Sequence, residues 1–218
     1  YRYKDGSFQS ESCFEGYHQK GVVQLCFSRD GKQLFSVGAT YTVAVYCCDP
    51  ADKRCGRMIG SSQGPKGRVF HCAALSSADA GPTRTYATCG EKHIWLWTVE
   101  KSGALKSAPV KKLDKYRNRS FLCVCGVGGQ GGLLVGTGDG DVIFCSAAGA
   151  LGGKFEAPQV HASAVNAAWS TPSGRLALTG DKDGKIVLWS CLGAELFELA
   201  SFALPDGDPV RALCLSPD

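Results

Sequence analysis

The sequence predicts an all-β fold made of about four copies of one structural unit, and three observations support this prediction. Short apolar runs recur along the 218 residues and are separated by turns that contain Gly, Asp or Pro. The chain has 28 glycines and one methionine, a composition that favours tight reversals over long helices. Equivalent positions in successive units are 47, 52, 44 and 45 residues apart, counted from the first apolar residue of each unit: Val22, Val69, Phe121, Val165 and Val210.

Each complete unit has the pattern strand, turn, strand, turn, strand. In the fourth unit the strands are expected at residues 164–170, 176–180 and 185–190, where the apolar runs are short and almost unbroken. Such runs are typical of strands that are covered on both faces. Units of about 40–45 residues with this pattern are typical of the blades of a β-propeller, in which each blade stacks on its neighbours.

We therefore expect consecutive four-stranded blades whose outer strands are weaker in pattern than the inner ones. The expected blades are residues 18–66, 67–117, 118–160 and 161–207. Residues 1–17 are expected to supply the outer strand of a preceding blade, and residues 208–218 the first strand of a following one. Because a closed ring usually needs more blades, the sequence predicts an incomplete ring whose two end flanks are exposed or covered by another chain.

The fourth unit resembles a WD repeat at four diagnostic positions: His161, Thr179, Asp183 and Trp189. In WD repeats the matching residues form a buried chain of hydrogen bonds that ties a loop to the strands. This is sensible chemistry, because a buried imidazole, hydroxyl and carboxylate must satisfy one another. A catalytic site with a hydroxyl nucleophile is the alternative interpretation, but the WD spacing already explains all four residues.

The other units match this pattern less well. In the fourth unit itself, Ser190 stands where the terminal Asp of the WD dipeptide is expected. In the third unit, Val135 and Cys145 replace the hydroxyl residue and the Trp. The first unit approximates the pattern with His18, Ser36, Thr40 and Tyr46.

Residues 88–100, TCGEKHIWLWTVE, are distinctive because the turn between their two strands is short. This segment resembles a blade of the echinoderm microtubule-associated protein-like (EMAP-like) family, and residues 121–124 and 136–143 are similar to that family's next blade. The resemblance covers most of residues 20–190, without the hydrophobic motif and coiled coil that precede the family's propellers. It implies an internal part of a cytoplasmic, cytoskeletal protein with tandem propellers and with tubulin or microtubules as partners. The alternative is a generic WD-repeat scaffold of another assembly, such as a ubiquitin ligase, a trafficking coat or a nucleic-acid complex.

A basic run lies between the second and third units: Lys106, Lys111, Lys112, Lys115, Arg117 and Arg119. One interpretation is a patch for an acidic partner, such as the acidic tails of tubulin or a phosphate backbone. The simpler interpretation is a solvated edge strand that lysines protect from aggregation. The mild net charge of +4 is compatible with an acidic partner and does not require one.

The twelve cysteines are expected to be reduced thiols, because Cys26, Cys72, Cys123 and Cys214 lie in apolar, strand-like runs. The alternative is a zinc site built from His71, Cys72, Cys89 and His93, or from Cys123 and Cys125. The spacing Cys-x-Cys is not that of a closed zinc site, and core cysteines explain the pattern better.

We expect no enzyme and no cofactor. The glycine-rich segments 128–132 and 136–140 lack the Gly-Lys-Ser/Thr of a phosphate-binding loop and lie where hairpin turns are expected. No apolar run is long enough to span a membrane as a helix, and a nucleic-acid partner is not favoured by the sequence. The expected partners are therefore proteins.

Overall fold

The computed structural model describes residues 2–4, 7–9, 17–75, 83–110, 116, 118–128, 132–145, 155–157, 160–192 and 195–214. These residues form eighteen strands, β1 to β18. None of the described residues forms a helix long and apolar enough to cross a membrane.

Sixteen of the strands form four antiparallel sheets of four strands each, here called blades 1 to 4. Blade 1 contains β3 (Val22–Phe27), β4 (Gln33–Gly38), β5 (Thr42–Cys47) and β6 (Met58–Gln63). Blade 2 contains β7 (Val69–Ala74), β8 (Arg84–Gly90), β9 (His93–Val99) and β10 (Leu105–Pro109). Blade 3 contains β11 (Phe121–Val127), β12 (Gly132–Thr137), β13 (Val142–Cys145) and β14 (Phe155–Ala157). Blade 4 contains β15 (Val165–Ser170), β16 (Leu176–Asp181), β17 (Lys185–Leu192) and β18 (Glu195–Ala203).

The four blades are equivalent in detail as well as in strand order. In each blade the pairing of the first two strands is interrupted once, one residue after the first strand begins. A bulge at this place bends the strand and increases its twist. The interruptions lie between Val22 and Gln24, Val69 and His71, Phe121 and Cys123, and Val165 and Ala167.

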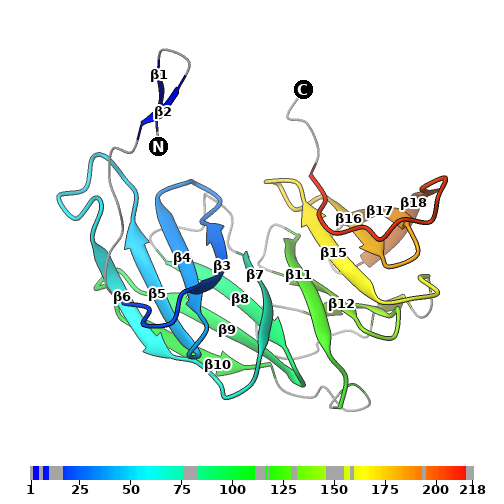
Figure 1. Cartoon of the computed structure of the whole chain (residues 1–218), viewed down its shortest axis with the longest axis horizontal. Coiled ribbons are helices and arrows are strands. Elements are labelled where there is room, and N and C mark those ends of the chain that lie inside the picture. Colours follow the sequence, from blue (N-terminus) through cyan, green and yellow to red (C-terminus); the bar gives the residue numbers. More distant parts are fainter. Residues whose placement is uncertain are drawn as a thin grey trace.

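The first strands of the blades, β3, β7, β11 and β15, lie next to one another along the inside of an arc (Figure 1). The fourth strands, β6, β10, β14 and β18, are outermost in their sheets. In the part of the chain that the structure describes, no strand pairing joins blade 1 to blade 4, and β7 and β11 separate β3 from β15 (Figure 1). The prediction of an all-β propeller segment with an incomplete ring is thus confirmed.

Most of the hydrophobic core lies between the blades. Between blades 1 and 2 the rings of Phe35 and Tyr86 stack with their centroids 4.6 Å apart, and Trp97 is buried beside them. Two further clusters join blade 2 to blade 3 and blade 3 to blade 4, and a smaller one lies in blade 1 around Leu34, Ala44 and Tyr46. Each large side chain that is fully buried in this way contributes about 1.5–3 kcal/mol, so the stacking of blades stabilises the arc.

The two ends of the chain are arranged differently from the blades. In residues 1–17, where a single outer strand was expected, β1 (Arg2–Lys4) and β2 (Ser7–Gln9) pair with each other in a separate two-stranded sheet. Residues 209–214 follow blade 4 and belong to no sheet, although Val210 is buried.

All exposed large apolar side chains of the described residues lie in blade 1, in blade 4 or directly after it. On β3, Val23, Leu25 and Phe27 alternate along one face and are 45%, 56% and 60% exposed. In blade 4, Trp189 faces blade 3, so Ser190 and its partner Phe197, which is 49% exposed, lie on the opposite face. Both end flanks therefore present apolar surface.

Candidate functional site

A buried chain of hydrogen bonds joins the loop before β15 to β16 and β17. The Trp189 indole N–H donates to the Thr179 hydroxyl over 2.8 Å, and that hydroxyl lies 2.8 Å from His161 Nε2. His161 Nδ1 in turn lies 2.9 Å from Asp181 Oδ2. Since the His161 and Asp181 side chains are at most 1% exposed, these groups depend on one another for partners.

The carboxylate in this chain of hydrogen bonds belongs to Asp181. The prediction that Asp183 supplies the carboxylate was wrong. Asp181 is two residues after Thr179 on β16, so strand alternation places both side chains on the same buried face. Asp183 is exposed in the following turn and contributes only its backbone N–H, which donates to Asp181 Oδ1 over 3.0 Å. The backbone N–H of Lys185 donates to the same oxygen over 2.9 Å.

Both ring nitrogens of His161 have a hydrogen-bond partner when the ring is neutral with its proton on Nδ1. Nδ1–H then donates to Asp181, and Nε2 accepts from Thr179. Burial lowers the pKa of His161, although the hydrogen bond and the charge of Asp181 act in the opposite direction. A second proton on Nε2 would leave the Thr179 hydroxyl proton without its acceptor, so the neutral form suits the site.

Blades 1 and 2 contain only part of this chain of hydrogen bonds. In blade 1, His18 Nε2 lies 2.7 Å from the Ser36 hydroxyl, and Nδ1 lies 2.8 Å from the hydroxyl of Thr42 rather than that of Thr40. In blade 2, the Trp97 indole N–H donates to the Thr88 hydroxyl over 3.0 Å.

Blade 1 also contains Tyr46, which is buried with 5% of its surface exposed. In blade 3, Val135 is fully buried in the core, and the side chain of Cys145 lies outside the described residues.

Two members of the basic run are described, and both are paired with acids. Lys106 Nζ lies 2.5 Å from Glu100 Oε1. Arg119 lies over the ring of Tyr116, pairs with Asp139 over 3.2 Å and also pairs with Asp141. The remaining members lie outside the described residues: Lys111, Lys112, Lys115 and Arg117.

The described cysteines are free, and no group of three His, Cys, Asp or Glu side chains in the described part of the chain is arranged to hold a metal ion. Burial raises the pKa of Cys123 to about 12 and raises that of Cys89 as well. At neutral pH these thiols are protonated, which suits packing and not metal binding or nucleophilic attack. His71 lies on β7, in the same sheet as Cys89, and its Nδ1 accepts from the backbone N–H of Val124 over 3.3 Å.

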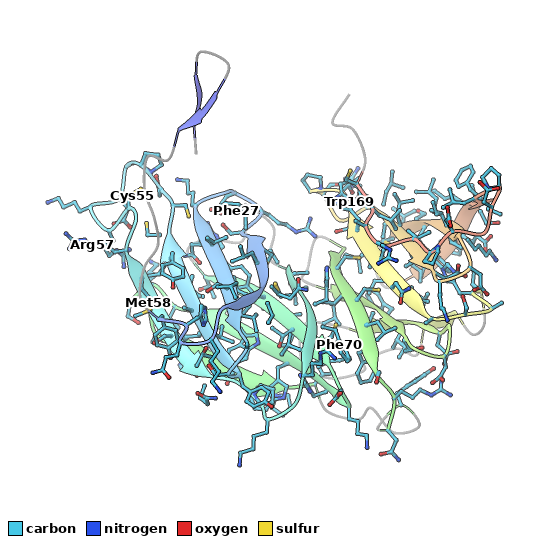
Figure 2. All side chains as sticks on the ribbon, viewed as in Figure 1. Phe27, Cys55, Arg57, Met58, Phe70 and Trp169 are labelled. Carbon is cyan, nitrogen blue, oxygen red and sulfur yellow. The ribbon has the colours of Figure 1, made fainter. Side chains whose placement is uncertain are left out.

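A cavity of about 470 Å³ lies on the inside of the arc. All four inner strands contribute to its wall, together with residues 211–213 after blade 4. Figure 2 shows Phe27 of blade 1 and Trp169 of blade 4 on opposite sides of this space, and both line the cavity. A cavity of this size is within the range that binds ligands or peptide segments.

Arg29, in the turn after β3, crosses from blade 1 to the other end of the arc. Its guanidinium donates to the carbonyl of Thr171 over 2.9 Å, to that of Gly126 over 2.6 Å, and to that of Pro172. These carbonyls belong to blades 3 and 4, so one side chain links the first blade to the last beside the cavity. Burial lowers the pKa of Arg29, and no carboxylate among the described residues pairs with it.

The neighbouring Asp30 joins blade 1 to blade 2. Burial alone would raise the pKa of its carboxyl, but hydrogen bonds from Arg84 and Ser28 outweigh this effect and lower the pKa to about 2. Arg84 Nε lies 3.2 Å from Asp30 Oδ2, and Ser28 donates to Oδ1 over 2.6 Å. The carboxylate oxygens of Asp30 therefore bond to Ser28 and Arg84, and no ion pair between Asp30 and Arg29 is found.

The cavity and its arginines were not foreseen from the sequence. The signal that was available is positional, because the last residues of each first strand meet around one axis in a propeller. By that rule Phe27 and Trp169 line the same cavity, although 142 residues separate them. Nothing in the local sequence indicates that Arg29 reaches across this axis.

Comparison with known proteins finds one WD-repeat match in the chain and a β-propeller fold. The family model described as "WD domain, G-beta repeat" matches residues 155–190. Among solved structures, the β-propeller domain of Myceliophteria thermophila Cps50 (Swd1) superposes with a TM-score of 0.66 at 17% identity, covering 87% of this chain and 61% of that one. The Dos1 propeller has a TM-score of 0.64 at 15% identity, covering 87% and 48%. Chaetomium thermophilum Sqt1, bound to the N-terminus of the ribosomal protein L10, has a TM-score of 0.66 at 16% identity, covering 93% and 56%.

The protein thus contains a WD repeat and folds as a segment of a WD-type β-propeller. It is similar to human echinoderm microtubule-associated protein-like 1, with 26% identity over 119 residues. This match covers 54% of the chain and 14% of that relative's length, and the chain spans about half to three fifths of the solved propellers.

Proposed function

We propose that this chain is a non-enzymatic protein-interaction module of a microtubule-associated, EMAP-like protein of the cytoplasm and cytoskeleton. The observation that carries the proposal is the 119-residue similarity to human echinoderm microtubule-associated protein-like 1, on a chain with a propeller fold. Tubulin in microtubules is the proposed partner.

The chemistry of the described residues supports a binding role without catalysis or cofactor. Thr179 and His161 resemble a nucleophile and a base, but both are 0–1% exposed and each is held in the buried chain of hydrogen bonds. A substrate has no access to them. The buried thiols have raised pKa values and are protonated, which removes the second group of candidate nucleophiles.

Co-sedimentation with polymerised microtubules tests the proposal. The purified chain is expected to pellet with microtubules at 50 mM salt and less at 300 mM, because acidic tails attract basic surfaces electrostatically. Absence from the pellet at 50 mM salt would refute a direct microtubule role.

The basic run can be tested in the same assay. Reversing four of its charges to Glu, at Lys111, Lys112, Lys115 and Arg117, is expected to abolish pelleting if the run binds tubulin. The matched control reverses four exposed lysines elsewhere, Lys20, Lys53, Lys66 and Lys182, with the same change in net charge. An equal loss in the control would show that only net charge matters and that the run is a protected strand edge.

A generic WD scaffold of another assembly is the second candidate function. It is favoured by the fold similarity to Sqt1, a propeller whose structure contains the N-terminus of another protein. Proximity labelling in cells separates the two candidates. Tubulin among the labelled proteins supports the first, while ubiquitin-ligase, coat or nucleic-acid-complex subunits without tubulin support the second.

The limits of the blades belong to the same proposal, including residues 208–218 as the first strand of a following blade. Val210 supports this, because a side chain at Gly180 would collide with Val210 as one at Gly136 would collide with Val165. Val165 begins blade 4, so Val210 occupies the corresponding place on the next flank. The Val210 backbone N–H also donates to the Asp181 carbonyl over 2.9 Å. The apolar end flanks are then covered by further blades or by another chain.

A further inference from the structure

Cys26 on β3 and Cys72 on β7 face each other across the contact between blades 1 and 2. These two first strands lie side by side (Figure 1). On β3, Leu25 and Phe27 face the open flank, so alternation turns Cys26 between them toward blade 2. On β7, His71 bonds to blade 3, so its neighbour Cys72 faces blade 1. Cys72 belongs to the core cluster that joins blades 1 and 2, and Cys26 packs against that cluster.

The two thiols are free and in hydrogen-bond contact with each other. The hydrogen bond to Cys72, followed by burial, raises the pKa of Cys26. Cys26 therefore stays protonated at neutral pH and donates to the Cys72 sulfur. The fully buried Cys123 differs, because its thiol donates to the Val165 carbonyl over 3.2 Å. The structure thus places the sulfurs of Cys26 and Cys72 next to each other.

The two blades hold this pair of thiols in position. The Gln24 amide, two residues before Cys26, donates to the carbonyl of Phe70, two residues before Cys72, over 2.8 Å. The stacked rings and the ion pair between the same blades restrict their relative motion further. Groups that are held together react as if at high concentration. A disulfide brings its sulfurs to about 2.05 Å, and a pair already in hydrogen-bond contact needs only a small further approach.

An oxidant can reach the pair from the cavity on the inside of the arc. Cys26 and Cys72 both line this cavity, whose volume is about 470 Å³. Hydrogen peroxide is little larger than water, so a space of this size admits it. Because the thiolate is the reactive form and the pKa of Cys26 is raised, we expect oxidation to be slow and to need a sustained supply of peroxide.

We propose that Cys26 and Cys72 are a site of reversible disulfide modification, at which hydrogen peroxide links blade 1 covalently to blade 2. The Cys72 thiol takes one oxygen atom from the peroxide, giving a sulfenic acid and one molecule of water. The Cys26 sulfur then attacks the Cys72 sulfur. A sulfur–sulfur bond forms, and the sulfenic hydroxyl leaves with the Cys26 proton as a second molecule of water. Two thiols are oxidised and one peroxide is reduced, and a dithiol reverses the change by thiol–disulfide exchange.

The disulfide is expected to stabilise the arc. It closes a long loop that includes most of blade 1, which lowers the conformational entropy of the unfolded chain. The Tm of the oxidised chain is therefore expected to be about 5–10 °C higher than that of the reduced chain. This modification does not depend on the proposed microtubule role.

Peptide mapping of the whole chain tests the site directly. The folded protein is treated with hydrogen peroxide at neutral pH, its remaining thiols are blocked with iodoacetamide, and it is digested with trypsin without reductant. Cleavage after lysine and arginine leaves Cys26 in residues 21–29 and Cys72 in residues 69–84, with no other cysteine in either peptide. The expected product is a disulfide that joins these two peptides, formed in the folded chain and lost with dithiothreitol. The matched control is the same treatment in urea, where we expect no preference for this pair.

Variants locate the change in Tm. Cys26→Ala and Cys72→Ala are each expected to lose the rise in Tm on oxidation. In Cys26→Ala the sulfenic acid should persist on Cys72 and be trapped there by dimedone. The control variant Cys125→Ala removes a similarly buried thiol between blades 3 and 4, whose hydrogen bond is with Ser170, and should keep the rise. Each variant is compared with its own reduced form, so a change in basal stability does not affect the comparison.

The mapping decides the proposal even if a variant fails to fold. A folded, peroxide-treated chain in which residues 21–29 and 69–84 are not joined would overturn it. Equal joining in urea would also overturn it, because the pair would then form without the fold. A rise in Tm that persists in Cys26→Ala would place the disulfide elsewhere, for instance at the exposed Cys55 (Figure 2).

Discussion

The Thr179 hydroxyl is at the middle of the buried chain of hydrogen bonds in blade 4. Removing this hydroxyl gives a quantitative test of how much those hydrogen bonds stabilise the protein. Thr179→Val keeps the shape of the side chain but removes the oxygen that contacts both Trp189 Nε1 and His161 Nε2. Both nitrogens would then be buried without a partner, since Trp189 is 2% and His161 1% exposed. An unsatisfied buried polar group costs about 1–3 kcal/mol, so the variant is expected to lose about 3 kcal/mol of stability.

Blade 2 provides the matched control. Thr88 is equally buried, but the hydrogen bond found for its hydroxyl is the one from the Trp97 indole N–H. Thr88→Val therefore leaves one buried group without a partner instead of two. The variant is expected to lose about half as much stability, about 1.5 kcal/mol.

Equilibrium unfolding in urea, followed by circular dichroism at pH 7.5 with a reductant, measures both values. The comparison is valid if both variants keep the m-value of the unmodified chain. If Thr179→Val loses no more unfolding free energy than Thr88→Val, the Thr179 hydroxyl does not have the two-partner role assigned to it.

Three further predictions follow from the same bonds and pKa directions. Asp181→Ala is expected to cost about 3 kcal/mol in the urea assay, because three donors lose their acceptor, whereas Asp183→Ala is expected to leave the midpoint unchanged. The pKa of Asp30 is lowered to about 2, below its ordinary value of 3.8, so its contribution to stability is present above pH 3.8 and is lost as the pH falls toward 2. Acid titration of Asp30→Asn should show a flatter loss of Tm over that window, and an unchanged curve would count against the Arg84–Asp30 pair. All four histidines have a lowered pKa, so the unfolded chain binds more protons below pH 6.5, and Tm should fall between pH 7 and pH 5.

The strands and their repetition could be predicted from the sequence because they depend on local pattern. The apolar runs that begin at Val22, Val69, Phe121 and Val165 all form a first strand. These are properties of neighbouring residues, and the spacing of the units adds the propeller architecture.

The predictions that were wrong concern residues at strand ends, where the direction of the side chain decides which residue forms the contact. Asp183 fits the spacing of a WD repeat, but Asp181 is the residue that alternation turns toward His161. The same occurred in blade 1, where Thr42 and not Thr40 meets His18. Sequence spacing alone does not fix which residue of a turn faces inward.

Contacts between distant parts of the chain could not be predicted at all. The basic run appeared as a row of free charges, yet Lys106 and Arg119 each have acidic partners in the fold. Arg29 was an ordinary turn residue in the sequence, because its partners are 97 to 143 residues away.

The reach of Arg29 also changes how the arc should unfold. In a linear array of repeats each unit is held only by its neighbours, so the end units fray first and independently. Here the guanidinium bonds to Gly126 and Thr171 must break before blade 1 can separate from the rest. Fraying of the first blade is thereby coupled to the third and fourth, and amide hydrogens of both ends are expected to exchange together, as parts of one cooperative unit.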